Sequence, residues 1–222
     1  MNQPHTSNAN LARLVTMLQD FYHASRALDY LRHHFGNPHN MSPGDRDRFY
    51  DSKDSIIRFN DTLVDAIPAC AEQFAFEELL AFLTEKFSAK DDPKHAADFH
   101  ERAREALVGM RNEVAVEQLL NAGGMQFRRG TVEEDGKGGD LFVEGVPIDF
   151  KSDEYSAERA RMRAEEGGYD SGMIVWSHVN FEDFESKLML PHERSLAIFA
   201  ELKPELEAAI AAHTNPQAPH TI

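Results

Sequence analysis

The sequence has a single cysteine, Cys70, and no apolar run that approaches the about 20 residues needed to span a bilayer. One cysteine excludes an intramolecular disulfide and a cysteine-rich zinc site. Residues 1–10 are polar and lack the apolar stretch of a secretory signal. From these absences we expect a cytoplasmic protein that does not enter a membrane.

Basic residues are also scarce. The chain has 23 Lys and Arg against 38 Asp and Glu, for a net charge of −15. DNA affinity comes mainly from Lys and Arg at phosphates, so this sign of charge opposes nucleic-acid binding. Two explanations remain open: a protein that never meets nucleic acid, or adaptation to high salt, which screens acidic self-repulsion. A nucleic-acid enzyme of this charge needs a local basic patch or a bound metal ion.

What is present fits a folded protein. The 222 residues are 41% hydrophobic, enough for one large domain or two small ones. After a loose tail over 1–10, apolar residues spaced three and four apart from Leu11 predict an amphipathic helix that ends near Gly36. Pro68 is expected to stop the first of the helices that follow. The predicted helices lie at 46–67, 69–87 and 93–121, so 1–98 is expected to be a helical N-terminal region.

Beyond residue 98 the pattern predicts an α/β domain over 99–222. Its sheet is expected to be mixed, to contain an antiparallel hairpin and to be flanked by helices. Pro204 is expected to break the last helix. Strands are predicted at 126–132, 140–143, 146–152 and 172–179, and helices at 155–166, 181–188 and 191–212.

A charged cluster coincides with the predicted hairpin. If Glu144-Gly145 is a two-residue turn, Asp140 lies directly opposite Asp149. Side chains alternate along a strand, so one face carries Asp140, Asp149 and Lys151. The other face collects only apolar residues, which are Leu141, Val143, Val146, Ile148 and Phe150. A bulged turn, which is also open because Glu is not preferred first in a tight hairpin, would make the two carboxylates diagonal.

Two opposed carboxylates indicate a cation site. At a Cβ separation of about 5 Å they repel by roughly 3 kcal/mol at an effective dielectric near 20. A fold gains no stability from such a pair, whereas a divalent cation between them makes the interaction favourable. Oxygen ligands of this kind suit Mg²⁺ or Mn²⁺. Lys151, on the same face, is placed to stabilise a developing anion or to orient a water.

This arrangement resembles the PD-(D/E)XK nuclease superfamily, which includes archaeal Holliday-junction resolvases and many restriction endonucleases. The resemblance covers about residues 101–179. It implies a restriction-endonuclease-like fold and metal-dependent hydrolysis of phosphodiester bonds, with DNA as the expected substrate, in repair, recombination, restriction or a mobile-element or viral role. Asp140 and Asp149 match the family's metal ligands, the backbone carbonyl of Phe150 often joins them, and Lys151 matches the family's lysine.

The resemblance also implies residues outside the hairpin. A glutamate on the preceding helix completes the family's site; Glu113 is the first choice and Glu117, one turn later, the second. Gly139 stands where the family often has proline. Arg159 and Arg163 share one face of the helix after the hairpin and can hold phosphates. Enzymes of this type often pair to cut two strands, so a homodimer is a further expectation.

Other interpretations remain open. A catalytically inactive member of the fold could serve as a protein-binding or nucleic-acid-binding module. The charged cluster could be a solvated sheet face on which Lys151 is only an ion-pair partner, and Glu113 could be an exposed helix residue. Arg26 and His33 loosely resemble the Arg–His motif of HEPN-type ribonucleases, although this spacing is common. The sequence does not separate DNA from RNA.

Overall fold

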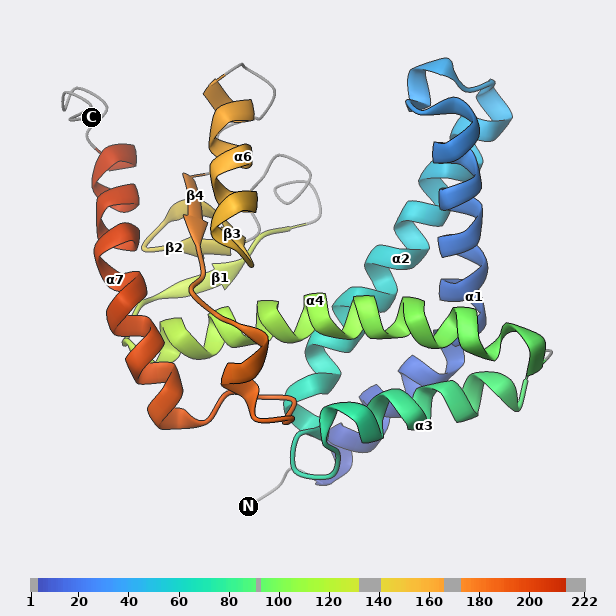
Figure 1. The fold of residues 1–222 in the computed structure, drawn as a ribbon, viewed down its shortest axis with the longest axis horizontal. Helices are drawn as coiled ribbons and strands as arrows, with labels where there is room; N and C mark the ends of the chain where they lie inside the picture. The colour runs from blue at the N-terminus through green and yellow to red at the C-terminus, as the bar shows by residue number, and fades with distance from the viewer. Residues whose placement is uncertain (1–3, 91–92, 132–140, 166–172, 215–222) are drawn as a thin grey trace. The chain divides into compact units, whose positions relative to one another are not determined.

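The computed structural model describes residues 4–90, 93–131, 141–165 and 173–214 (Figure 1). It is a mixed α/β protein in which helices accompany one four-stranded sheet. The chain divides into two compact units, 1–114 with 186–189, and 115–185 with 190–222. Each unit has its own hydrophobic core. The predicted domain boundary after residue 98 stays a prediction.

The first unit is helical. Helices α1 and α2 lie side by side as a hairpin joined through the short 3₁₀ helix η1 (Figure 1). Their buried faces meet α3 and the first part of α4 in one core, where the Phe87 and Phe99 rings stack with centroids 4.1 Å apart. The bounds are α1 (Pro4–Phe35), η1 (Pro38–Asn40), α2 (Pro43–Cys70), α3 (Phe76–Ser88), η2 (Pro93–His95) and α4 (Ala96–Ala122).

Several predicted helix ends are wrong. The expected tail over 1–10 is already helical from Pro4, and α2 continues through Pro68 to Cys70. The last helix also continues through Pro204, because the fully buried Leu202 and Leu206 on either side of it hold that segment against the core. Burial of neighbouring turns thus outweighs the one hydrogen bond that an internal proline removes.

The second unit contains the sheet. Its strands stand in the order β1-β2-β3-β4; the first two pairings are antiparallel, and β3 and β4 run parallel. The mixed sheet with its antiparallel hairpin is therefore confirmed. The bounds are β1 (Phe127–Arg129), β2 (Leu141–Val143), β3 (Val146–Lys151), α6 (Glu154–Glu165), β4 (Met173–Trp176), η3 (Phe181–Phe184) and α7 (His192–Thr214).

The helix predicted over 181–188 is only the 3₁₀ turn η3. Glu185 and Ser186 follow it with φ of 49° and 66°, a left-handed conformation that cannot continue a right-handed helix. Among the helices of the described residues, none combines the length and the apolar character that crossing a membrane requires.

The two faces of the sheet are covered differently. Leu141, Val143 and Ile148 are buried in a core that also contains Leu119 of α4 and Leu202 of α7. The opposite face lies against α6, which Figure 1 shows alongside β3 and β4. The small apolar cluster on that side consists of Ala157, Ala160 and Ile174, with Ala164 and Trp176 packed at its edge. The sheet is therefore buried on both faces.

Candidate functional site

The hairpin has the predicted register. Leu141 pairs with Ile148 and Val143 pairs with Val146, so two residues form the turn between β2 and β3. All four side chains are buried on one face, as the alternation predicts. Asp140, predicted to lie opposite Asp149, is outside the described residues, and its position there stays a prediction.

The turn uses an unexpected residue for a sound reason. Glu144 and Gly145 have φ of 50° and 84°, and positive φ at both positions is what a type I′ turn requires. Gln126, which precedes β1, holds Glu144 in this conformation, because the Glu144 backbone N–H donates to the Gln126 carbonyl at 2.9 Å. Its carboxylate in turn accepts from the Gln126 N–H at 2.8 Å. These contacts offset the poor turn preference of glutamate, and no bulge shifts the described pairs.

Asp149 and Lys151 form a close ion pair on the other face of β3. Lys151 Nζ donates to Asp149 Oδ1 at 2.7 Å and lies 2.5 Å from Oδ2. Only 2% of the Asp149 side chain is exposed, against 25% for Lys151. Asp149 Oδ2 accepts no hydrogen bond of good geometry from any described residue. The carboxylate is thus buried, with the Lys151 ammonium close to both of its oxygens.

The burial of Asp149 follows from the strand that pairs with β3. In the parallel register Asp149 lies beside Ile174 and Lys151 lies beside Trp176, so these four share a face. Helix α6 packs its Ala157 onto that face through Ile174. The face is therefore not solvated at Asp149, and the interpretation of this carboxylate as a simple surface charge is wrong.

The residue between them faces the other way. The Phe150 side chain is half-buried and packs against the core of the second unit, as the alternation requires. The possible role of its backbone carbonyl as a metal ligand stays a prediction.

The start of α6 fixes the segment that leaves the site. Asp153 Oδ1 accepts from the Ser156 N–H at 2.8 Å, and its Oδ2 accepts from the Ser156 hydroxyl at 2.7 Å. These two hydrogen bonds favour the charged carboxylate and lower the pKa of Asp153. The cap sets the point at which the chain turns from β3 into the helix that covers Asp149.

The two predicted glutamates have different surroundings. Glu117 accepts two hydrogen bonds from the Arg129 guanidinium, at 2.5 and 3.1 Å, and so ties α4 to β1 within the second unit. Glu113 is half-buried on the part of α4 that belongs to the first unit. Its role as a metal ligand stays a prediction.

The arginines of α6 also differ from one another. Arg159 is exposed, with its guanidinium carbon 5.6 Å from the centre of the Tyr155 ring, and it forms no ion pair with any described residue. Arg161 instead pairs with Glu205 of α7 and donates to the Ile174 carbonyl at 3.3 Å. Arg163 lies in the same helix, but its side chain is outside the described residues. Of the α6 arginines whose side chains the structure describes, Arg159 is therefore the one that is available to a phosphate.

A polar cluster beside Lys151 was not predicted. The backbone N–H of Trp176 donates to the Glu205 carboxylate at 3.3 Å, and His178 Nε2 lies 3.4 Å from the same carboxylate. The His178 ring stacks on Trp176 with centroids 3.9 Å apart, in a backbone conformation with φ of 59°. The residue that joins these groups is Glu205 of α7, one position after Pro204. It carried no signal, because its partners lie 27 to 44 positions away.

The Arg–His pair of the alternative ribonuclease interpretation lies on α1. Arg26 donates to the Tyr22 hydroxyl at 3.4 Å, and His33 is exposed nearer the end of the helix. No described contact joins the two side chains.

Within the described parts of the chain, no three His, Cys, Asp or Glu side chains converge as a metal site would require. Of the predicted ligands, the structure describes Asp149 and Phe150 in the second unit and Glu113 in the first. A comparison of the chain with protein-family models, curated proteins and solved structures found no match.

Proposed function

We propose that this chain is a metal-dependent endonuclease of the PD-(D/E)XK type that hydrolyses phosphodiester bonds in DNA. The observation that carries the proposal is the Asp149–Lys151 pair, a buried carboxylate and an ammonium on one face of a sheet strand. It follows a tight hairpin whose described register has the spacing predicted for the site.

Stability alone gives little reason to keep this pair. Removing two charges from water costs several kcal/mol per ion, and the attraction between them often does no more than offset that cost. Apolar residues could fill the space under α6, where the neighbours are Ala157 and Ile174. A retained buried charge is therefore a reason to look for chemistry at Asp149.

The described donor fits a hard divalent cation. Asp149 is a carboxylate, the kind of oxygen ligand that Mg²⁺ or Mn²⁺ prefers, and the Lys151 ammonium, 2.5 Å from its Oδ2, would have to move aside when a metal ion binds there. Asp140 is the proposed second ligand. When bound, the cation would lower the pKa of a coordinated water and neutralise the scissile phosphate.

The chain's own groups have distinct tasks in this proposal. Asp149 would bind the divalent cation through its carboxylate, which α6 shields from water. Lys151 is more exposed than Asp149 and can turn its ammonium toward the attacking water or the phosphate oxygen. Arg159, exposed on α6, can hold a neighbouring phosphate of the same strand.

The restriction-endonuclease-like fold belongs to the same proposal. Its support is the order of elements, in which α4 precedes three antiparallel strands and α6 leads to a parallel fourth strand. The catalytic residues then lie on the central strand β3, between its antiparallel and its parallel neighbour.

Cleavage assays test the activity. Purified protein is incubated with supercoiled plasmid, linear duplex, branched DNA and RNA, with Mg²⁺, with Mn²⁺ or with EDTA. We expect cation-dependent cleavage of a DNA substrate that falls about 100-fold or more in Asp149→Asn and in Lys151→Met. Glu158→Gln, an exposed change on α6, is the matched control and should cut like the parent.

The outcomes separate the proposal from its alternative. Cleavage that persists in Asp149→Asn at the parent's rate contradicts the assigned site. No cleavage of any of these substrates contradicts the nuclease and favours a binding module built on the same fold.

A further inference from the structure

A pocket of about 370 Å³ lies within the helical unit, where α1, α2 and α4 meet. On α2 it is lined by Lys53, Ile56, Ile57 and Asn60, a spacing that places all four on one side of the helix. The volume falls within the range of about 300–1,000 Å³ that is usual for small-molecule sites. The pocket is remote in sequence from Asp149 and does not depend on the proposed nuclease.

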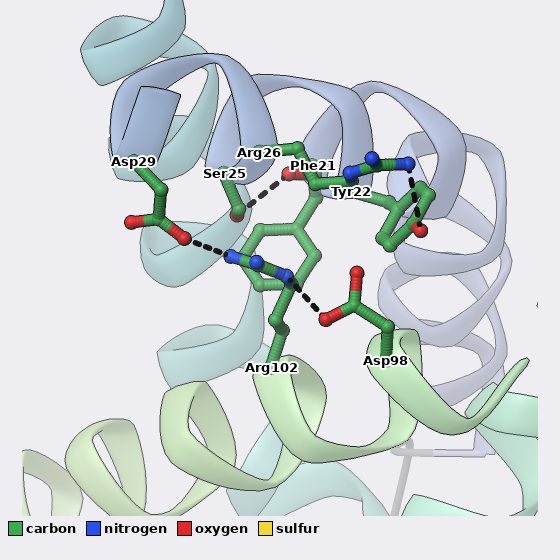
Figure 2. A network of polar contacts seen from close by, with 7 residues as sticks. All are labelled: Phe21, Tyr22, Ser25, Arg26, Asp29, Asp98 and Arg102. Atoms are coloured by element: carbon green, nitrogen blue, oxygen red, sulfur yellow. Dashed lines mark hydrogen bonds and ion pairs between the residues drawn. The ribbon is translucent and has the colours of Figure 1, made fainter. Parts of the chain in front are cut away.

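One cation of the lining is already neutralised. Arg102 of α4 donates to Asp29 of α1 at 2.6 Å and to Asp98 at 3.2 Å, and Figure 2 shows its guanidinium between the two carboxylates. Its side chain is 22% exposed, so the network is partly shielded from solvent. Arg102 therefore joins α1 to α4 and shapes the pocket wall, and it has little charge left for a ligand.

Two other cations of the lining, Arg32 and Lys53, are not paired with a carboxylate of the described residues. The Arg32 guanidinium carbon lies 6.0 Å from the centre of the Phe49 ring. The remaining acidic residue in the lining is the exposed Glu105. In a chain of net charge −15, two uncompensated cations at one small pocket indicate a place for an anion.

The rest of the lining suits an apolar body with a hydrogen-bond donor. Phe21 and Leu28 of α1 and Ile56 of α2 supply an apolar wall. Asn60 lines the pocket, and its Oδ1 accepts no hydrogen bond from any described residue; because that atom is buried, the side-chain amide must rotate before a ligand can reach it. A buried acceptor without a partner costs about 1–3 kcal/mol, which a donor on a ligand would recover.

From these features we propose that the pocket binds a small organic phosphate of the nucleoside-monophosphate class. The base lies against Phe21, Leu28 and Ile56, and one of its N–H groups donates to Asn60 Oδ1. The phosphate binds Lys53 and Arg32, which supply a point charge and a fork of donors.

Calorimetry on the full chain without divalent cations tests this site. The probes are the common ribonucleoside 5′-monophosphates, their nucleosides and inorganic phosphate. At least one monophosphate should bind with a Kd below about 1 mM, and its nucleoside and inorganic phosphate should each bind at least about 10-fold more weakly. That pattern would show that the pocket reads both ends of the ligand.

Variants locate the site. Lys53→Gln and Asn60→Leu should each weaken the monophosphate about 10-fold. Lys86→Gln, which removes the same charge on α3 outside the pocket, should not. Lys53 is exposed, so its variant keeps the fold even if Asn60→Leu does not. Asp149→Asn should bind like the parent.

Three results would overturn the proposal. The first is that no monophosphate reaches half-saturation by about 1 mM. The second is equal weakening by Lys53→Gln and Lys86→Gln, which would mean general attraction of an anion. The third is loss of binding in Asp149→Asn, which would place the ligand in the sheet unit.

Discussion

Asp149 and Lys151 are two positions apart on β3, and each determines what the other can do. Asp149 is 2% exposed, and Lys151 is the cation within 2.5 Å of its carboxylate. A buried charge that loses its partner costs far more than the pair contributes when intact. The pair is therefore one electrostatic unit, and its two residues should not behave independently when they are changed.

A double-mutant cycle measures this coupling. We expect Lys151→Met to lower the free energy of unfolding by about 1–3 kcal/mol, because it leaves the Asp149 carboxylate buried without its cation. Adding Asp149→Asn should restore much of the loss. Urea unfolding measures the stability of each variant. Lys203→Met is the control, because Lys203 is exposed and its ion pair with Glu207, at 3.7 Å, is a surface pair that contributes little to stability. Additive effects of the two changes would contradict the coupling.

At this scale the sequence predicts faces better than depths. Strict alternation places Asp149 and Lys151 on one face and Ile148 and Phe150 on the other, and the structure has that arrangement. The alternation carries no information on what covers the charged face. Asp149 is buried because α6 packs there, and the Arg161–Glu205 pair joins residues 44 positions apart, which no local pattern can indicate.

Helix α6 depends on its cap. Its first turn is held by Asp153, whose two oxygens accept hydrogen bonds from Ser156. Because these bonds lower the pKa of Asp153 in the folded protein, their stabilisation is complete above the unfolded pKa and is lost as the pH falls through the folded pKa.

The corresponding prediction concerns two variants. Asp153→Ala should lower stability by about 1 kcal/mol at pH 7, and its difference from the parent should shrink as the pH falls below about 4. Asp153→Asn keeps a capping oxygen that does not titrate, so its stability should lack this pH dependence. Thermal unfolding across this pH range measures both. A constant difference between Asp153→Ala and the parent would contradict the role of the charged cap.

Gly123, just after the end of α4, and Gly109, inside α4, are expected to change stability in opposite directions when replaced by alanine. A Cβ at Gly123 would lie 2.1–2.4 Å from ring atoms of Phe199, and Phe199 belongs to the core of the second unit. A Cβ at Gly109, inside the helix, would meet nothing within 4 Å.

We therefore predict that Gly123→Ala lowers the free energy of unfolding by about 1–3 kcal/mol, as overpacked cores do. Gly109→Ala should raise it by about 0.5–1 kcal/mol, because alanine loses less backbone entropy in a helix. Urea titration of both variants decides the matter. Equal effects would mean that Phe199 moves aside and does not fix the end of α4.

Elements with a regular pattern were the most predictable. The hairpin, α6 and β4 lie within a few residues of their predicted positions, because alternation and helical spacing are strong over those segments. Proline was a poor guide: Pro68 and Pro204 lie inside helices whose neighbouring turns are buried. Packing between residues far apart in the sequence determined where these helices end, and local sequence patterns do not indicate such packing.

The charge of the whole molecule bears on the proposed chemistry. With a net charge of −15 the chain repels nucleic acid over long distances and attracts divalent cations without any specific site. Salt screens both effects. The buried Asp149 is screened much less than exposed carboxylates, so a specific site there should survive conditions that remove general cation accumulation.

Calorimetric titration with Mn²⁺, at low salt and again at about 1 M salt, is the most direct test of the account. At 1 M the Debye length is only about 3 Å, so diffuse attraction is suppressed. We predict that the parent keeps saturable binding at high salt and that Asp149→Asn loses it. If the parent shows no binding at either salt, or if Asp149→Asn binds as the parent does, the metal-dependent nuclease assigned to Asp149 is contradicted.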